Sequence, residues 1–212
     1  MTSHVLEAGN RATFAATGED LCLAFANTRY WRGRPAATET LPGFGDLVAW
    51  LKANAGLPAD LVTAAQAWSA AHADAAATAL ADAIALREAI YRLFGAVAAG
   101  EAVSDSDVAI LNRALAEARP RTRLARRADG VGWAAASLKP TLPVLLAPVS
   151  WSAADLLTHA ADRRIRRCAN DECLWLFMDH SKGGTRRWCD MNSCGNRAKS
   201  RRHYGRARQD KV

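Results

Sequence analysis

Hydrophobic residues recur at helical spacing through the first three quarters of the chain, which predicts a mainly α-helical body. From Leu47 to Leu51 they fall on one helical stripe. Gly56 and Pro58 follow, a pairing that is typical of one helix ending and the next beginning. The longer region Leu61–Gly100 is rich in alanine, and its larger apolar side chains approximate a single helical face. Because alanine favours helix at little entropic cost, we expect helix through this region.

The rest of the body is expected to add one more helix and a small β-hairpin. The helix should begin at Ser104 and end near Pro120. Asp129 and Gly130 then separate two extended runs, and this dipeptide favours the positive φ of a hairpin turn. We therefore expect two antiparallel strands on either side of this dipeptide.

Prolines and polar residues divide the end of the body. Three prolines between positions 140 and 148 allow only a short or kinked helix there. Ser152 and Asp155 resemble a capping box, which predicts that a new helix begins at this point and ends near position 161. The basic run Arg163–Arg167 then marks a domain boundary. The chain is accordingly divided into a helical domain, 1–160, and a second domain, 161–212.

The positive charge of the protein is concentrated in the second domain. Residues 163–212 carry 14 Lys/Arg and 5 Asp/Glu, whereas the preceding 162 residues carry 14 and 16. This asymmetry indicates a polyanionic partner at the C-terminal end, and a solvated basic tail is the alternative. The longest uncharged stretch, 15 residues with three prolines, is too short to span a bilayer, so no membrane partner is expected.

Four cysteines in the second domain have the spacing of a metal site. Cys168-x4-Cys173 and Cys189-x4-Cys194 form two equal pairs separated by fifteen residues. Without a recognisable secretion signal we expect the reducing cytoplasm, where spaced cysteines indicate a metal before a disulfide. Four thiolates suit one structural Zn²⁺ in a tetrahedral site. Two disulfides or free thiols are the alternatives, and His180 and His203 are possible substitute ligands.

A structural ion would also stabilise a unit that is too small for a core of its own. A domain of about 45 residues usually needs such a staple, and structural zinc contributes about 10–16 kcal/mol in finger peptides. Between the cysteine pairs, Leu174–Met178 is expected to be a strand and Arg186–Trp188 its return strand. The aromatic residues Trp175, Phe177 and Trp188 would form a miniature core or, alternatively, stack on bases.

A basic helix is expected after the last cysteine. Asn196 is interpreted as its cap and Gly205 as its stop. Its cations fit a phosphate-binding footprint, and Asn196 or Arg197 would be suited to reading base edges. Arg197 has the alternative of a salt bridge within the finger or donation to a zinc-bound sulfur. The candidate nucleic-acid residues are Arg186, Arg187, Asn196, Arg197, Lys199, Arg201, Arg202, Arg206 and Arg208.

The helical body shows no catalytic equipment, so the protein is not expected to be an enzyme. Its histidines are scattered, it has no phosphate-cradling glycine loop, and Cys22 lies among apolar residues as a small buried hydrophobe. A ligand pocket in the body would include Asn27 and Arg29. For Asn27, a helix cap is the alternative interpretation.

The chain resembles two known families. Residues 187–199 resemble the signature of the CGNR zinc finger, named for the residues Cys194 to Arg197, and the first cysteine pair and the Phe177–Ser181 pattern fit as well. The segments 23–28, 86–88 and 153–157 are similar to the ABATE domain, which usually precedes this finger. Ala24 departs from the Asp that this family usually carries, which argues against a ligand-binding acid at that position.

The resemblance implies a helical sensing domain followed by a treble-clef or ribbon-like zinc finger, in a stress-induced bacterial transcription regulator. Duplex DNA is the expected partner, and a small-molecule inducer and a homodimer are left open. The basic helix would also suit RNA or the ribosome, or an acidic protein surface. A third alternative is a ββα-metal nuclease, suggested by the order of Asp179, His180, Asn196 and His203.

Overall fold

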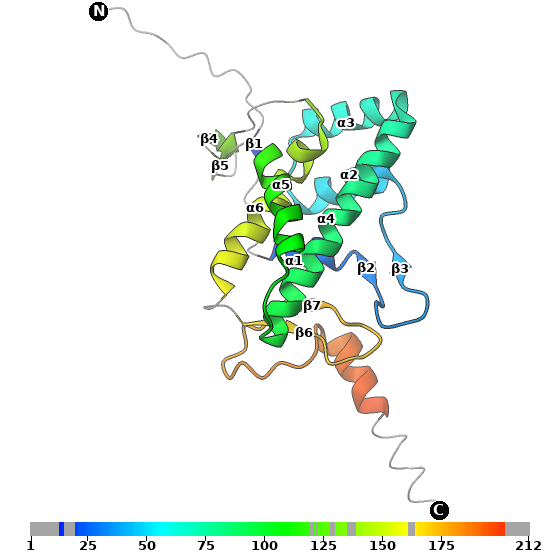
Figure 1. Cartoon of the computed structure of the whole chain (residues 1–212), viewed down its shortest axis with the longest axis vertical. Helices are drawn as coiled ribbons and strands as arrows, with labels where there is room; N and C mark the ends of the chain where they lie inside the picture. The colour runs from blue at the N-terminus through cyan, green and yellow to red at the C-terminus, as the bar shows by residue number, and fades with distance from the viewer. Residues whose placement is uncertain are drawn as a thin grey trace, which may run out of the picture.

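Helices make up most of the protein in the computed structural model, which describes residues 13–14, 20–118, 121, 123–127, 130–134, 139–160 and 164–201. The mainly helical class is confirmed (Figure 1). The longest of the described helices, α4, packs against α1, α5 and α6. The helices are α1 (Leu21–Ala26), α2 (Phe44–Asn54), α3 (Ala59–Ala71), α4 (Ala73–Ala99), α5 (Asp105–Glu117) and α6 (Leu142–Thr158). None of the described helices is long and apolar enough to cross a membrane.

The helix boundaries follow local sequence signals in most places. Gly100 ends α4 in the left-handed region, with φ of 72°, and Ser104 precedes α5 as expected. The alanine-rich region is divided into α3 and α4 at His72, whose ring stacks on Trp68. Leu86, Ile90, Leu93 and other apolar residues of α4 are buried in the core that these helices share.

The expectation of a separate helix beginning at Ser152 is wrong. α6 runs without interruption from Leu142 to Thr158 and contains Pro148. The Ser152 hydroxyl accepts a hydrogen bond from the backbone N–H of Cys22 at 3.1 Å, in the first turn of α1. Ser152 therefore caps a helix 130 residues away instead of its own. Asp155 is likewise engaged elsewhere, in an ion pair with Arg121.

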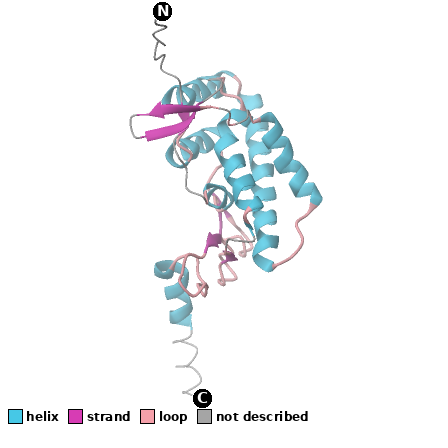
Figure 2. Ribbon diagram, turned by 90° about the vertical axis from the view of Figure 1, so that its left-hand side faces the viewer, coloured by secondary structure: helices cyan, strands magenta, loops and turns pink. Residues whose placement is uncertain are grey.

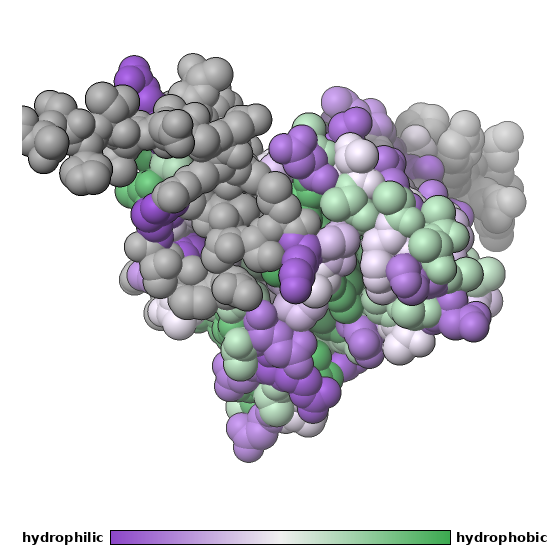
Figure 3. Space-filling model, turned by 90° about the horizontal axis from the view of Figure 1, so that it is seen from above, coloured by the Kyte–Doolittle hydropathy of each residue, from purple (hydrophilic) through white to green (hydrophobic). Residues whose placement is uncertain are grey.

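The expected hairpin is present at the end of the molecule opposite the cysteines (Figure 2). β4 (Leu124–Arg127) pairs with β5 (Gly130–Ala134), and Arg127 faces Gly130. Asp129, which was expected in the turn, lies outside the described residues. A third strand, β1 (Thr13–Phe14), joins the other edge of β5. Seen from this end, the described surface is a mixture of hydrophilic and apolar side chains (Figure 3).

Two further strand pairs lie nearer the cysteines. β2 (Arg29–Tyr30) and β3 (Thr38–Glu39) form a short ribbon that the sequence did not predict. β7 (Leu176–Met178) falls within the predicted strand, but its partner is β6 (Ile165–Arg167). The prediction that Arg186–Trp188 is the return strand is wrong, because the supposed boundary segment occupies that place.

One hydrophobic core extends across the expected domain boundary. Ile165, Leu176 and Met178 are buried in the same cluster as the helices of the body. β6 and β7 both pack against α4. The C-terminal unit is therefore stabilised by apolar contacts with the body in addition to its own four-cysteine site.

Candidate metal centre and nucleic-acid interface

The four spaced cysteines meet at one point of the structure. The sulfur atoms of Cys168, Cys173, Cys189 and Cys194 all lie within 4.8 Å of one another. Two of the separations are 3.7 and 3.8 Å. Zn–S bonds of about 2.3 Å place tetrahedral sulfurs about 3.8 Å apart, so the donor set and its spacing fit zinc. These four thiolates hold one structural zinc ion.

The alternatives for the cysteines do not fit this geometry. All five cysteines of the chain are free, and sulfurs 3.7 Å apart are too distant for a disulfide bond of about 2.0 Å. His180 is exposed and is not part of the cluster, while His203 lies outside the described residues. Cys22 is buried in the body, as expected of a small hydrophobe.

The first pair is held by a tight knuckle that follows β6. The N–H of Cys173 donates to the carbonyl of Asn170 at 2.9 Å, and Leu174 then takes a left-handed conformation with φ of 59°. The Asn170 side chain reaches across the site, where its Nδ2 donates to the sulfur of Cys194 at 3.4 Å. Such contacts from outside the ligand set orient metal ligands. Sequence reasoning missed Asn170.

The second pair spans the start of a terminal helix, of which residues 191–201 are described. Asp190 accepts hydrogen bonds from the N–H groups of Asn192 and Ser193, which begins a π-helical turn, Met191–Gly195. An α-helix continues directly through residues 196–201, the last that are described. Asn196 is therefore not the helix cap, and that expectation is wrong. Cys194 lies in the first helical turn, so zinc fixes the beginning of this helix.

The thiols are close enough to affect one another's ionisation. Hydrogen bonds from Cys173 and Cys189 lower the pKa of Cys168 to about 2. The pKa values of Cys173 and Cys189 are raised, because each donates to the thiolate of Cys168. A cation replaces the shared protons and compensates the charge of four thiolates.

The aromatic residues of the finger surround the sulfur cluster. Phe177 is buried against it, and Trp175 and Trp188 are partly buried in the same group. This is the miniature core that was one of the two expectations for them. Trp175 also packs edge-on against Tyr30 of β2, with ring centroids 4.9 Å apart. The finger core thus reaches the body.

Asp179 anchors the turn between β7 and the second cysteine pair. Its side chain is fully buried and accepts from the hydroxyl and the N–H of Ser181, from Arg166 Nε and from the N–H of Arg186. The Ser181 hydroxyl is the main reason that the pKa of Asp179 is lowered to about 2. All these contacts are internal to the finger, so Asp179 acts in holding the loop.

The terminal helix divides its polar residues between two roles. Arg197 lies over the ring of Trp31 at 4.4 Å, and Arg201 donates to Asn170 at 3.2 Å. Asn196 and Lys199 are exposed, although the Asn196 Nδ2 also donates to the carbonyl of Asn192. Neither alternative proposed for Arg197 describes its contact with Trp31. The remaining candidates, Arg202, Arg206 and Arg208, lie outside the described residues.

The two arginines before Cys189 also differ. Arg186 Nε donates to the carbonyl of Trp188 at 2.8 Å, its Nη2 donates to the carbonyl of Cys189, and its guanidinium lies over Phe177. It is therefore committed to holding the finger together. Arg187 is exposed, with its guanidinium 5.4 Å from the ring of Trp188.

Two family models match the chain, and together they cover most of it. The ABATE model, described as "putative stress-induced transcription regulator", matches residues 19–160. The CGNR zinc finger model matches residues 164–207. The chain belongs to the ABATE family. Its C-terminal part is a CGNR zinc finger with the four-cysteine site described above. No curated protein matches the chain.

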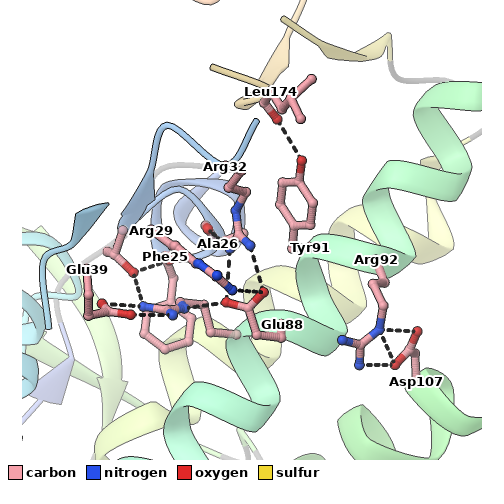
Figure 4. Close-up of polar contacts among 12 residues, drawn as sticks. Phe25, Ala26, Arg29, Arg32, Glu39, Glu88, Tyr91, Arg92, Asp107 and Leu174 are labelled. Atoms are coloured by element: carbon pink, nitrogen blue, oxygen red, sulfur yellow. Dashed lines mark hydrogen bonds and ion pairs between the residues drawn. The ribbon is translucent and has the colours of Figure 1, made fainter. Parts of the chain in front are cut away.

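An ion network within the ABATE domain leads toward the finger (Figure 4). The guanidinium of Arg87, which is 1% exposed, binds both carboxylate oxygens of Glu39 at 2.7 Å and one oxygen of Glu88 at 3.0 Å. Although burial opposes it, hydrogen bonding to Arg87 lowers the pKa of Glu39. Glu88 in turn pairs with Arg32 at 2.6 Å. The network thereby joins β3, α4 and the loop after β2.

The network ends on the first zinc knuckle. The guanidinium of Arg32 lies 3.8 Å from the centre of the Tyr91 ring, and the Tyr91 hydroxyl donates to the carbonyl of Leu174 at 2.9 Å. Sequence reasoning missed Arg32 and Tyr91. The resemblance at residues 86–88 was the signal that pointed to this part of the ABATE domain.

A loop of the ABATE domain touches both the knuckle and the terminal helix. The N–H of Gly33 donates to the carbonyl of Glu172 at 3.1 Å, and Arg34 pairs with the Glu172 carboxylate at 2.8 Å. Trp31 lies near two guanidinium groups, that of Arg34 at 4.2 Å and that of Arg197 at 4.4 Å. Through this loop, the ABATE domain contacts the helix that carries the candidate nucleic-acid residues.

The two residues expected to line a ligand pocket, Asn27 and Arg29, make contacts within the protein. Both polar atoms of the Asn27 carboxamide bind the backbone of Leu176, and Asn27 is also the C-terminal cap residue of α1. Arg29 lies 3.8 Å from Glu88 and is partly exposed. A hollow of about 490 Å³ between α3, α4 and the start of α6 is lined by Trp68, Thr78, Asp82 and Leu142 among others, but by neither Asn27 nor Arg29. The role of Arg29 in binding a ligand stays a prediction.

Proposed function

We propose that this ABATE-family protein is a bacterial transcription regulator that binds duplex DNA through the terminal helix, whose first turn contains Cys194. The observation that carries the proposal is the way zinc, the knuckle and the body hold this helix. Cys194 and Ala198 face inward, whereas Asn196 and Lys199 are exposed to a partner. A polar and cationic helix face held on a rigid base is the arrangement that phosphate and base-edge contacts require.

The position of the helix supports this role. In Figure 1 it lies at the end of the molecule remote from β1, β4 and β5 and projects from the finger. Its exposed residues Asn196 and Lys199 are accessible to a partner. The excess of positive charge in residues 163–212 supplies the long-range attraction to a polyanion.

The ABATE domain is proposed to sense a signal and to transmit it to the finger. Support comes from the contacts of the body with the finger, which include the Asn27–Leu176 pair and the Tyr91–Leu174 hydrogen bond. A ligand that shifted the loop 31–34 would alter the surroundings of Arg197 directly, because Trp31 lies against its guanidinium. A ligand that shifted α4 would act on the zinc knuckle through Tyr91 and Leu174. Coupling of this kind requires that the ligand bind two arrangements of the protein with different affinity.

The proposal is tested with full-length, zinc-loaded protein and a labelled duplex in a salt series. Lys199→Glu replaces an exposed cation of the terminal helix, and Lys52→Glu makes the same change on α2. Loss of a phosphate contact makes the slope of log K against log salt shallower by about 1. We expect that change for Lys199→Glu and a slope close to wild type for Lys52→Glu. No binding at low salt, or equal effects of the two variants, would contradict the proposal.

The same experiment separates DNA from other partners. Structured RNA is added as a competitor, since an A-form helix offers similar phosphates. RNA displacing duplex DNA at equal concentration would favour the RNA or ribosome alternative. Failure of every nucleic acid, with an acidic protein retained in a pull-down, would favour a protein-interaction module.

We further propose that the protein is not an enzyme. Support comes from Asp179, which a nuclease of the ββα type would need at its metal, but whose oxygens accept four hydrogen bonds within the finger. Incubation of plasmid with Mg²⁺ tests this directly. Nicking that disappears in His180→Ala would overturn it. The four zinc-binding thiolates favour the reducing cytoplasm as the compartment.

A further inference from the structure

A hollow of about 430 Å³ lies beside the first zinc knuckle and is lined by four arginines. Arg166 and Arg167 come from β6, and Arg186 and Arg187 come from the segment before Cys189. The end of α4 forms an apolar wall. The volume is within the range of pockets for small ligands, about 300–1,000 Å³, but the lining is cationic. Sequence analysis did not select Arg166 or Arg167.

The arginines of this hollow are only partly compensated by acids. Arg166 pairs with Asp179 at 2.9 Å, and the backbone N–H of Arg186 donates to the same carboxylate. Arg167 and Arg187 are exposed and form no ion pair with another described residue. Two guanidinium charges are therefore left without a carboxylate in the described part of the chain.

The acidic residue in the lining of the hollow, Asp171, does not neutralise these two positive charges. Asp171 lines the hollow, but its carboxylate lies 3.6 Å from Arg201 of the terminal helix. Asp171 is thus shared between the two basic surfaces. Like charges gathered around one concave surface repel unless an anion lies among them.

The hollow is held in shape before any ligand arrives. Arg166 is fixed by Asp179 and by the carbonyl of Gly184, and Arg186 is fixed by the carbonyls that follow it. The N–H of Ala169 donates to the carbonyl of Arg187 at 2.8 Å, which ties the two arginine-bearing segments together. On this framework Arg167 and Arg187 carry guanidinium groups without a carboxylate partner among the described residues, and each such group presents a planar fork of donors that matches the oxygens of a phosphate.

We propose that this hollow binds a phosphate group, and that the phosphate belongs to the backbone of the nucleic acid that the terminal helix contacts. The inference rests on the proposed function for the source of the phosphate. The knuckle residues 170–172 lie between the two surfaces, since Asp171 lines the hollow while Asn170 binds Arg201. A polyanion that crosses the knuckle therefore contacts both the helix and the hollow. A free phosphorylated molecule offers the same chemistry and is the other source to be tested.

The test uses full-length, zinc-loaded protein and the double variant Arg167→Ala/Arg187→Ala. The matched control, Lys52→Ala/Arg113→Ala, removes two exposed cations from α2 and α5. In a salt series with duplex DNA, we expect the slope of log K against log salt to become shallower by about 1–2 in the first variant. The control should keep the wild-type slope. The double variant Arg167→Lys/Arg187→Lys should keep a slope close to that of the wild type, because both positive charges remain.

A second arm separates the two sources of phosphate. Inorganic pyrophosphate is titrated into wild type and the alanine variant by calorimetry, after zinc content and circular dichroism have shown that both are folded. An unchanged DNA slope, together with pyrophosphate binding that the variant loses, would overturn the backbone source in favour of a free phosphorylated molecule. An unchanged slope without pyrophosphate binding would overturn the site.

The two proposals can fail separately. If wild type binds no nucleic acid, the proposed function fails, and the pyrophosphate titration alone decides whether the hollow takes phosphate. If Lys199→Glu weakens DNA binding and the arginine variant does not, the terminal helix keeps its role and the backbone source is overturned.

Discussion

The carboxamide of Asn27 forms two hydrogen bonds with the backbone of Leu176, donating to its carbonyl at 2.8 Å and accepting from its N–H at 3.0 Å. A side chain at the end of α1 thereby takes the place of a neighbouring strand for β7. This pair joins the two family-matched parts of the protein at the point where both are buried.

Replacement of Asn27 by Ala is expected to destabilise the whole protein. It leaves the N–H and carbonyl of Leu176 without their partner, and an unsatisfied buried polar group costs about 1–3 kcal/mol. Asn54→Ala is the control, because that amide is exposed and binds only the carbonyl of Trp50 in its own helix. Urea unfolding of the zinc-loaded proteins should show a clearly lower free energy of unfolding for Asn27→Ala. For Asn54→Ala the free energy of unfolding should change by no more than about 0.5 kcal/mol. Equal losses would contradict this account.

Gly33 is expected to be intolerant of a side chain. A Cβ at this position would lie 1.7 Å from the carbonyl oxygen of Asp171, so Gly33→Ala must push the loop away from the knuckle. Such overpacking costs about 1–3 kcal/mol. Gly95 in α4 has no atom within 4 Å of the equivalent position, and Gly95→Ala should stabilise by about 0.5–1 kcal/mol. A lower melting temperature for Gly33→Ala and a higher one for Gly95→Ala would support the close approach of Gly33 to the Asp171 carbonyl. An unchanged melting temperature for Gly33→Ala would refute it.

Removal of zinc is expected to disorganise the finger and leave much of the body helical. Ser in place of Cys168, Cys173, Cys189 or Cys194 should abolish the single equivalent of zinc, whereas Cys22→Ala should retain it. Burial raises the pKa of the Cys22 thiol to about 12, so it should not react quickly with thiol reagents at pH 8. Elemental analysis and thiol titration before and after chelation measure both effects. Undiminished DNA binding after complete chelation would contradict the role of the metal.

The Glu39–Arg87 pair should make stability depend on pH. The pKa of Glu39 is lowered from 4.5 because, although burial opposes it, Arg87 binds the carboxylate. A group with a lowered folded-state pKa stabilises above its unfolded pKa, and this contribution is lost as the pH falls through the folded value. Wild type should therefore exceed Glu39→Gln in stability at pH 7, and the difference should shrink below about pH 4.5.

The comparison is made between proteins because acid also releases zinc from both. Glu101→Gln, an exposed change just after α4, controls for charge alone. Urea unfolding at several pH values between 7 and 3.5 gives the difference curve. If the stability difference between wild type and Glu39→Gln grew as the pH fell, the predicted direction of the pH dependence would be wrong.

Local pattern was sufficient for most of the helices and for the metal ligands. The stripe from Leu47 to Leu51, the glycine after α4 and the two cysteine pairs each signal their structure within a few residues. Such signals are readable because helix propensity, capping and tight turns depend on neighbours in sequence. The same is true of the hairpin at Gly130.

The predictions from sequence were wrong where a residue binds a partner that is distant in the chain. Ser152 and Asp155 have the spacing of a cap but bind Cys22 and Arg121, and β7 pairs with β6 instead of with the segment that follows it. The helix start at Asp190 was overlooked because a π-helical turn precedes the regular helix. Contacts of this kind are decided by packing across the fold, which spacing along the chain does not specify.

Cys194 sets the angular phase of the terminal helix. Because an α-helix turns by about 100° per residue, one residue inserted between Cys194 and Lys199 would swing every later side chain about a quarter of a turn around the axis. The cations would then point elsewhere even though their number and the metal were unchanged. The interval between the last thiolate and the exposed cations is therefore as much a part of the binding surface as the cations themselves.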